Sequence, residues 1–460
     1  MSKSVAAHTL GCKVNQHETE SLLEMFRRRG YEVVDFDSPA SVYIINTCTV
    51  THLGDRKSRQ VIRQAAKRNP EAKVVVTGCY AQRAPEEIAG IPGVSLILGN
   101  RGRDQLVDLV EGISGGDSGK EDALTPGPRR VVSDISRCRE FEELPFALER
   151  GRTRAMVKVQ EGCSQFCSYC IVPYTRGPVR SRREEEIIRE IAALVENGYR
   201  EVVLTGIHTS AYGQDRIVDG KREADLATLV EDILLQVPDL PRLRISSVEP
   251  VEVPDAIPDL MNRHPTFCRH LHLPLQSGDD RVLKMMRRPY TSSQYAAVVE
   301  GLRRRVEGLA VTADIMVGFP GETDQNFENS YRLVRDLGLS DLHVFKYSPR
   351  PGTPAAALSD QVPPPVKEER SKALLELAGR LRRDFARGFL GTTRGVLIEQ
   401  QVPGKKQRPT GGSGTAVWEG YTDNYLRVAV EVPGGEDARG RLARVKLTGL
   451  GWDMVLGEII

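Results

Sequence analysis

The stretch EGCSQFCSYCIVPYTRGPVRSR, residues 161–182, places Cys163, Cys167 and Cys170 in one short loop. Single metal ions and iron–sulfur clusters are usually held by four protein ligands, and the neighbouring sequence offers no fourth thiolate or imidazole. A 4Fe-4S cluster held by three cysteines keeps one iron open to an external chelating ligand. The spacing therefore predicts a 4Fe-4S cluster of this kind, in which the iron without a protein ligand is the functional position.

Six strand-like runs, each followed by a helical stretch, surround this loop and extend toward the carboxyl terminus. They cover residues 155–160, 201–206, 242–247, 270–275, 311–319 and 341–347. Alternation of this kind favours parallel strands with helices outside them, and six units predict a partial (β/α)6 barrel over residues 151–388. The cysteine loop comes directly after the first strand, at the edge where α/β barrels gather their ligands.

A second set of cysteines lies in the amino-terminal segment, residues 1–111. Strands are predicted over 5–10, 42–46 and 74–77, and Cys12, Cys48 and Cys79 each follow one of them. Parallel strands end at one edge of a sheet, so the three thiols are predicted to converge there and to hold a second 4Fe-4S cluster with an open iron. The alternative is that all three behave as small buried apolar residues.

Cysteine usage and composition limit the other possibilities. Eight cysteines in 460 residues are too few for a disulfide scaffold, and Cys138 and Cys268, which follow no strand end, are interpreted as structural. The loop triad could also be a zinc site completed by His208 or His272, or a group of unpaired core cysteines. No apolar run suits a membrane helix and the start is too polar for a signal peptide, so we expect a cytoplasmic protein without a membrane partner.

The remaining segments differ in composition from these two domains. Residues 112–150 begin GISGGDSGKEDALTPGPRR, rich in Gly, Pro and charge, which predicts a linker. After a basic amphipathic helix near 366–388, residues 389–460 are rich in Gly and strand formers and predict a small β-barrel. The fold class is therefore α/β, with a parallel amino-terminal domain, a partial barrel and a small β-barrel.

The loop resembles the CxxxCxxC motif of the radical S-adenosylmethionine superfamily, with Tyr169 at its usual aromatic position. The resemblance implies that the open iron binds the methionyl part of S-adenosylmethionine. The implied cofactor-binding residues follow later strands: Thr205, Gly206, Ser247, Glu249, Gln276, Ser277, Gly318, Gly321 and Glu322. One departure is that the chain has Thr205-Gly206-Ile207-His208 where many members of the superfamily carry a Gly-Gly-Glu run.

TLGCKVNQHETE, INTCTV, TGCYAQR, HLPLQSG and GFPGETD, together with the loop, are similar to motifs of the methylthiotransferase family over nearly the whole chain. The resemblance implies a TRAM-like RNA-binding barrel at the carboxyl terminus and two 4Fe-4S clusters, one cleaving S-adenosylmethionine to a 5′-deoxyadenosyl radical and one delivering sulfur. Lys13, Val14, Asn15 and Gln16 resemble the branch that adds a methylthio group to carbon-2 of N6-threonylcarbamoyladenosine beside the transfer RNA anticodon.

Three alternatives to that function stay open at this stage. The same chemistry could act on isopentenyladenosine in transfer RNA or on an aspartate of a ribosomal protein, and the chain could instead be a zinc-containing RNA-binding protein without activity. An enzyme of this family also implies an electron donor, flavodoxin- or ferredoxin-like, and a sulfur source as partners. No side-chain general base is implied.

Clusters of basic residues are candidates for RNA phosphate contacts. After the cysteine loop and in KMMRRPYT, residues 284–291, they are Arg176, Arg180, Arg182, Arg183, Lys284, Arg287 and Arg288. In the tail they are Lys405, Lys406 and Arg408, with Trp418, Tyr421 and Tyr425 as aromatic neighbours. The formal net charge of +2 gives no general basic field, so RNA binding must depend on local surfaces such as these.

Overall fold

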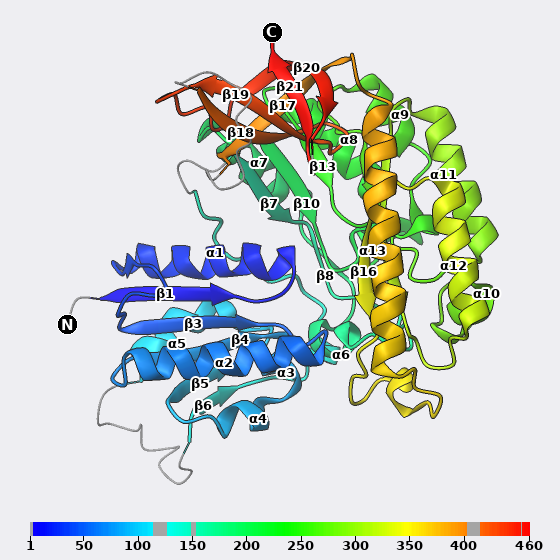
Figure 1. Cartoon of the computed structure of the whole chain (residues 1–460). Coiled ribbons are helices and arrows are strands. Elements are labelled where there is room, and N and C mark those ends of the chain that lie inside the picture. The colour runs from blue at the N-terminus through cyan, green and yellow to red at the C-terminus, as the bar shows by residue number, and fades with distance from the viewer. Residues whose placement is uncertain (1–2, 114–126, 149–152, 403–414, 452) are drawn as a thin grey trace.

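The computed structural model describes residues 3–113, 127–148, 153–402, 415–451 and 453–460. Three units follow one another along the chain, and Figure 1 shows the amino-terminal sheet beside the large central unit, with the red carboxy-terminal strands packed against one end of the latter. No helix of the described part of the chain is long and apolar enough to span a membrane.

The amino-terminal unit is a six-stranded parallel sheet in the order β2-β1-β3-β4-β5-β6. Its strands are β1 (Ser4–Thr9), β2 (Glu32–Val33), β3 (Val42–Thr47), β4 (Lys73–Gly78), β5 (Val94–Leu98) and β6 (Arg129–Val131). Its helices are α1 (Lys13–Arg28), α2 (His52–Arg68), α3 (Cys79–Arg83), α4 (Pro85–Ala89) and α5 (Leu106–Glu111). Apolar residues of α2, α3 and α4 pack on one face, and those of α1 and α5 on the other.

The predicted parallel α/β domain is therefore confirmed, but its boundary is not at residue 111. β6 lies inside the segment predicted as a linker and pairs in parallel with β5. The run RRV that forms β6 is short and follows a Gly- and Pro-rich stretch, so the composition of this segment indicates a linker rather than a strand.

The central unit is the predicted partial barrel. Its strands are β7 (Arg154–Lys158), β10 (Glu201–Thr205), β13 (Leu243–Ile245), β14 (His270–His272), β15 (Ala310–Val317) and β16 (Asp341–Lys346). They form two parallel halves, β13-β10-β7 and β14-β15-β16, joined by a parallel bridge between Ser247 and His272. Because β7 and β16 do not pair with each other among the described strands, the barrel is open along one side.

Helices cover the outside of this barrel. They are α6 (Val172–Arg176), α7 (Glu184–Glu196), α8 (Leu226–Gln236), α9 (Ile257–Arg263), α10 (Asp280–Met285), α11 (Ser292–Arg305), α12 (Asp324–Leu337) and α13 (Pro364–Arg387). Two short antiparallel pairs complete the unit: β8 (Gln160–Glu161) with β9 (Arg180–Ser181), and β11 (Ile217–Val218) with β12 (Lys221–Arg222). The largest apolar core lies between these helices and the strands.

The tail is a closed five-stranded barrel, as predicted. It contains β17 (Thr393–Gln401), β18 (Thr415–Thr422), β19 (Arg427–Pro433), β20 (Leu442–Leu450) and β21 (Val455–Ile459). It sits at the amino ends of the central strands, where Arg242 donates to the carbonyls of Gly395 and Tyr421, and Tyr425 stacks on His270 at a centroid distance of 4.6 Å. The opposite, carboxyl ends carry the cysteine loop.

Candidate active site

The loop triad is held by backbone contacts rather than by its own side chains. Gly162 has φ +76°, and a Cβ there would lie 1.8 Å from the carbonyl oxygen of Pro178, so only glycine fits before Cys163. The Cys163 amide donates to the Gly177 carbonyl at 2.9 Å, and the Ser168 amide donates to the Met286 carbonyl at 3.0 Å. These bonds fix the loop at the carboxyl end of the barrel.

The three thiols of this loop lie close enough to interact. Burial raises the pKa of Cys167 and of Cys170, and Cys163 raises both further by electrostatic repulsion between thiolates. Arg288 opposes this effect at Cys167, since its guanidinium donates to that sulfur at 3.4 Å while also pairing with Glu249. Three adjacent thiols are suited to metal ligation, because a bound metal ion displaces their protons.

His208 is the histidine that approaches this triad. Its Nδ1 lies 3.8 Å from the Cys163 sulfur, and its Nε2 lies 2.8 Å from a Glu252 carboxylate oxygen. Burial lowers its pKa, but hydrogen bonds to Cys163 and Glu252 outweigh burial and raise the pKa to about 10. The two ring nitrogens of His208 therefore face protein groups on both sides, the Cys163 thiol and the Glu252 carboxylate.

The geometry does not favour the zinc alternative. Among the described residues, one set of ligand atoms comes within 4.8 Å of one another, and it consists of His272, Asp314 and His343. Neither cysteine triad, with or without His208, is compact enough for a single tetrahedral ion. A four-iron cluster is larger than one ion and needs a wider arrangement of thiols.

The second triad forms at the carboxyl edge of the amino-terminal sheet. Cys12 precedes α1, Cys48 follows β3 and Cys79 begins α3 after β4, and β1, β3 and β4 are adjacent strands. A Cβ at Gly11, which has φ +106°, would lie 2.9 Å from the Cys48 Cβ. Burial raises the pKa of Cys48 to about 12, and the nearby Cys79 and Cys12 add to that increase. The predicted convergence of the three cysteines is therefore present, and they fit a second cluster.

Arg176 reaches from the segment after the cysteine loop to the amino-terminal triad. It lies on α6, six residues after Cys170, and is completely buried. Its Nε donates to the Cys79 sulfur at 3.2 Å, and its terminal nitrogens donate to Glu18 at 2.6 Å and to Glu161 at 3.2 Å. A residue of the central unit thus completes the surroundings of a cysteine in the amino-terminal unit.

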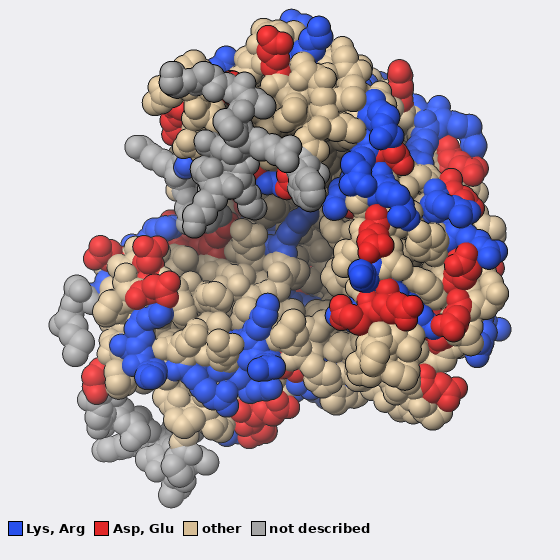
Figure 2. All heavy atoms as spheres, in the orientation of Figure 1, with Lys and Arg blue, Asp and Glu red and all other residues tan. Residues whose placement is uncertain are grey.

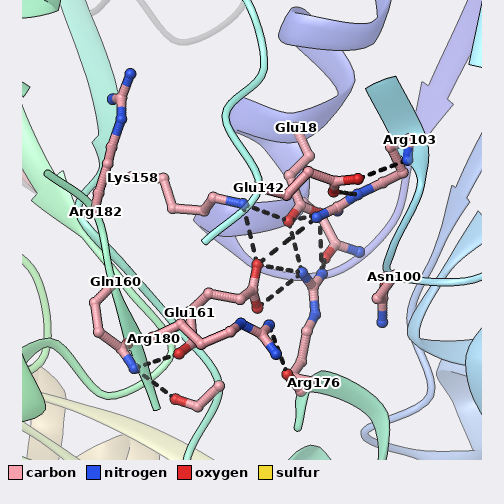
Figure 3. A network of polar contacts seen from close by, with 12 residues as sticks. Glu18, Asn100, Arg103, Glu142, Lys158, Gln160, Glu161, Arg176, Arg180 and Arg182 are labelled. Atoms are coloured by element: carbon pink, nitrogen blue, oxygen red, sulfur yellow. Dashed lines mark hydrogen bonds and ion pairs between the residues drawn. The ribbon is translucent and has the colours of Figure 1, made fainter. Parts of the chain in front are cut away.

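Charges of both signs surround Arg176. Figure 3 shows Lys158 and Arg103 reaching the same carboxylates, with Glu142 on the far side of Arg103. Burial acts to raise the pKa of Glu18, but its cationic neighbours outweigh burial and hold that pKa well below its ordinary value. Three cations therefore pair with three carboxylates at the interface between two domains, and Arg180 adds a fourth buried cation near Glu161.

Asn15 extends this network to the other two cysteines. Its side-chain oxygen accepts from Arg176 and lies 3.7 Å from the Cys12 sulfur. Its amide nitrogen donates to the Leu10 carbonyl at 2.8 Å and to the Thr47 carbonyl at 3.1 Å, beside Cys48. The position of Arg176 therefore affects the backbone at all three strand ends.

This network overturns part of the predicted RNA contacts. Arg176, Arg180 and Arg182 are at most 3% exposed, and Arg182 pairs with Glu143 and Glu190. Arg288 is also buried, against Cys167 and Glu249. None of the four lies where a phosphate could reach it: Arg176, Arg182 and Arg288 pair with carboxylates inside the protein, and the buried Arg180 donates to the Arg176 carbonyl at 2.9 Å.

The other residues predicted to contact RNA are either exposed, outside the described residues, or packed within the protein. Arg183, Lys284 and Arg287 are exposed, so their contact with RNA stays a prediction. Lys405, Lys406 and Arg408 lie outside the described residues. In the tail barrel Trp418 is buried in the core, whereas Tyr421 and Tyr425 face the central unit, where the Arg244 guanidinium lies 4.4 Å from the centroid of the Tyr425 ring.

The candidate cofactor-binding residues divide into two groups. Thr205, Gly206, Ser247, Glu249 and Gln276 gather at the carboxyl ends of β10, β13 and β14, beside the cysteine loop.

Ser277, Gly318, Gly321 and Glu322 form the second group. The Glu322 carboxylate accepts from the Gly318 amide at 2.9 Å and pairs with Arg370 at 2.6 Å, and the Ser277 hydroxyl bonds to Ser330. The Ser277 and Glu322 side chains therefore bond within the protein, away from the cysteine loop, and the first group offers the nearer cofactor contacts.

Comparison with known proteins agrees with this site. Residues 4–99 match the model described as "Uncharacterized protein family UPF0004", and residues 157–334 match the radical SAM superfamily. A solved structure of the radical S-adenosylmethionine methyltransferase TsrM from Kitasatospora setae has the same fold, with a TM-score of 0.57 at 17% identity over 77% of each chain. Fold and cysteine loop together define a radical S-adenosylmethionine protein.

Curated relatives give the narrower family. The threonylcarbamoyladenosine tRNA methylthiotransferase MtaB of Bacillus subtilis is 41% identical, covering 99% of this chain and 96% of the relative. The protein of the same name from Aquifex aeolicus is 38% identical, covering 86% and 93%. A tRNA-2-methylthio-N6-dimethylallyladenosine synthase of Sorangium cellulosum is 35% identical, covering 95% and 90%. The chain belongs to the radical S-adenosylmethionine methylthiotransferase family.

Proposed function

We propose that this enzyme converts N6-threonylcarbamoyladenosine in transfer RNA into its 2-methylthio derivative. The observation that carries the proposal is the pair of cysteine triads, Cys163–Cys167–Cys170 and Cys12–Cys48–Cys79, with the buried Arg176 of the loop segment against Cys79 of the second triad. The relatives named for this substrate include the most similar one reported above.

The residues of each triad have a distinct task in this proposal. When bound, a cluster at Cys163, Cys167 and Cys170 would supply the electron that cleaves S-adenosylmethionine, and one at Cys12, Cys48 and Cys79 would supply sulfur. Glu249, fixed by Arg288, and the exposed backbone of Gly206 would orient the cofactor beside the open iron.

Further partners follow from the chemistry. Reductive cleavage needs an external electron donor, for which a flavodoxin- or ferredoxin-like protein is proposed, and repeated turnover needs a sulfur source. We place the protein in the cytoplasm because its proposed substrate is transfer RNA.

Nucleoside mass spectrometry of transfer RNA from a deletion strain tests the proposal. Loss of the 2-methylthio threonylcarbamoyl nucleoside, with its precursor accumulating and the methylthio isopentenyl nucleoside unchanged, is the expected result. Loss of the isopentenyl derivative instead would assign the chain to that substrate, and no change in either nucleoside would contradict a role in transfer RNA.

A further inference from the structure

We propose that the outer face of α2 is the surface along which the transfer RNA backbone lies while its target nucleotide enters between the two triads. The inference rests on the proposed function, since it requires an RNA substrate. It names a contact surface that the sequence motifs did not indicate.

The composition of α2 is one-sided. Its 17 residues carry six cations, Arg56, Lys57, Arg59, Arg63, Lys67 and Arg68, and a single acid, Asp55. The inner face packs Val61, Ile62 and Ala65 into the core under the sheet. A helix with an apolar inner stripe and a basic outer face presents its charge to solvent.

Four of the cations are exposed and without an internal partner. Arg56, Lys57, Arg63 and Lys67 are exposed, and within the described residues none of them makes an ion pair. Arg56, Arg63 and Lys67 are spaced by seven and eleven residues from the first, which places them on one side of the helix. Gln60 and Gln64 lie beside them on the same face.

The one acid of α2 does not reduce this outward charge. Asp55 is only 4% exposed and points inward, where Arg83 contacts it at 3.2 Å and Arg350 also pairs with it. Thr49 donates to the same carboxylate at 2.6 Å. The outer face is therefore uniformly basic, and Figure 2 shows Lys and Arg atoms gathered over the region that α2 occupies in Figure 1.

The start of α2 ties this surface to the candidate active site. The helix begins four residues after Cys48, and the Ser58 hydroxyl faces the Cys48 carbonyl at 3.4 Å. The His52 amide donates to Ser348 of the central unit at 3.1 Å, so the same end touches both domains. At about 1.5 Å per residue the helix extends roughly 25 Å away from the triad.

Apolar side chains stand where the basic face meets the cysteines. Val50 and Leu53 are 51% and 57% exposed, directly between Cys48 and the first cation of the helix. Exposed apolar groups beside a basic track suit a single strand whose bases leave their stack, because the cations hold phosphates while the apolar groups contact base faces.

The occupant is RNA rather than an anionic membrane. A membrane-binding helix inserts its apolar face, and that face of α2 is buried against the sheet. The contrast with α13 supports specific use of α2: α13 also has many cations, but it intersperses Glu368, Glu369, Glu376 and Asp384 among them. Mixed charge is typical of an ordinary solvated face.

The test compares two triple variants of the full chain, reconstituted anaerobically. One neutralises the proposed surface with Arg56→Gln, Arg63→Gln and Lys67→Gln. The matched control neutralises three exposed cations of α13 with Lys372→Gln, Arg383→Gln and Arg387→Gln. The binding of bulk transfer RNA is measured over a series of salt concentrations, and iron content and the melting temperature of each variant confirm folding.

The α2 variant should bind transfer RNA about tenfold or more weakly, and its slope of log K against log salt should fall by roughly 2, since three phosphate contacts each contribute about 0.7–0.9. The control should keep the wild-type slope. Equal affinity and slope in the two variants and the wild type would overturn the α2 surface.

Two further outcomes separate this inference from the proposed function. Wild-type protein that binds no transfer RNA would contradict the proposed function itself. Binding of phosphatidylglycerol vesicles that the α2 variant loses, while its transfer RNA binding is unchanged, would assign the face to a membrane and overturn the RNA proposal.

Discussion

The two cysteine triads use opposite ways of building one kind of site. Cys163, Cys167 and Cys170 come from a single loop, so eight residues of sequence determine their spacing. Cys12 and Cys79 are 67 residues apart and meet only because β1, β3 and β4 are neighbouring parallel strands. The first site depends on local backbone geometry, and the second depends on the whole sheet.

Each triad has one arginine in contact with one of its sulfur atoms, and the two arginines differ in where their partners lie. Arg288 contacts Cys167 and pairs with Glu249, all within the central unit. Arg176 contacts Cys79 across a domain boundary and neutralises two carboxylates, Glu18 and Glu161. The arginine that contacts the loop triad belongs to the same domain as that triad. The arginine that contacts the triad of Cys12, Cys48 and Cys79 comes from the other domain.

The largest expected effects come from removing a cysteine of each triad. Cys170→Ala should abolish reductive cleavage of S-adenosylmethionine, because the cluster that supplies the electron loses one of its three protein ligands. Cys48→Ala should retain cleavage and lose methylthiolation. Anaerobic assays that measure 5′-deoxyadenosine and the methylthio nucleoside separately check this, and loss of cleavage in Cys48→Ala would remove the proposed division of tasks.

Arg176→Gln should have the next largest effect. It leaves Glu18 and Glu161 buried beside Lys158 and Arg103 with one cation too few, which costs about 3–5 kcal/mol in unfolding free energy. Denaturant unfolding measures this cost. Iron should be lost mainly from the cluster at Cys12, Cys48 and Cys79. A variant with wild-type stability and iron content would contradict the role given to Arg176.

Arg288→Gln should be milder. It releases Glu249, which is partly accessible to solvent, so the expected loss of unfolding free energy is about 1–3 kcal/mol. Its main effect should be weaker binding of S-adenosylmethionine, seen as a higher KM for the cofactor, since Glu249 lies among the proposed cofactor contacts. An unchanged KM would remove Glu249 from that set.

Arg183→Gln provides the smallest effect and a control for both arginines. Arg183 is exposed, follows the same loop as Arg176 and lies at the start of α7. A substitution there should change unfolding free energy by at most about 0.5 kcal/mol. A loss of unfolding free energy as large as that of Arg176→Gln, measured by the same denaturant unfolding, would contradict this account. It would show that basic residues near the loop act through their general charge rather than through buried ion pairs such as those of Arg176.

The sequence predicted the strands well because their signals are local. All six strand runs of the central barrel and the three strand ends with cysteines are where the pattern predicted them, and the tail barrel closes as expected. β6 was missed because three residues after a Gly-rich stretch carry too little pattern.

Partners distant in sequence could not be predicted. Arg176 looked like a surface cation because nothing near it in the chain reveals that Glu18, 158 residues away, lies against it. The basic face of α2 can be read from the spacing of residues 56, 63 and 67, but only the fold shows that it begins beside Cys48 and that its one acid points inward. The burial of Trp418 could not be predicted either, because it depends on how the strands of the tail barrel close.

Iron and acid-labile sulfide content after anaerobic reconstitution tests the central claim most directly. The wild-type chain should hold about eight irons, and triple alanine variants of either triad should each hold about four. Zinc in place of iron at either triad, or a wild-type content that does not fall when Cys12, Cys48 and Cys79 are replaced, would contradict the account of two separate cluster sites.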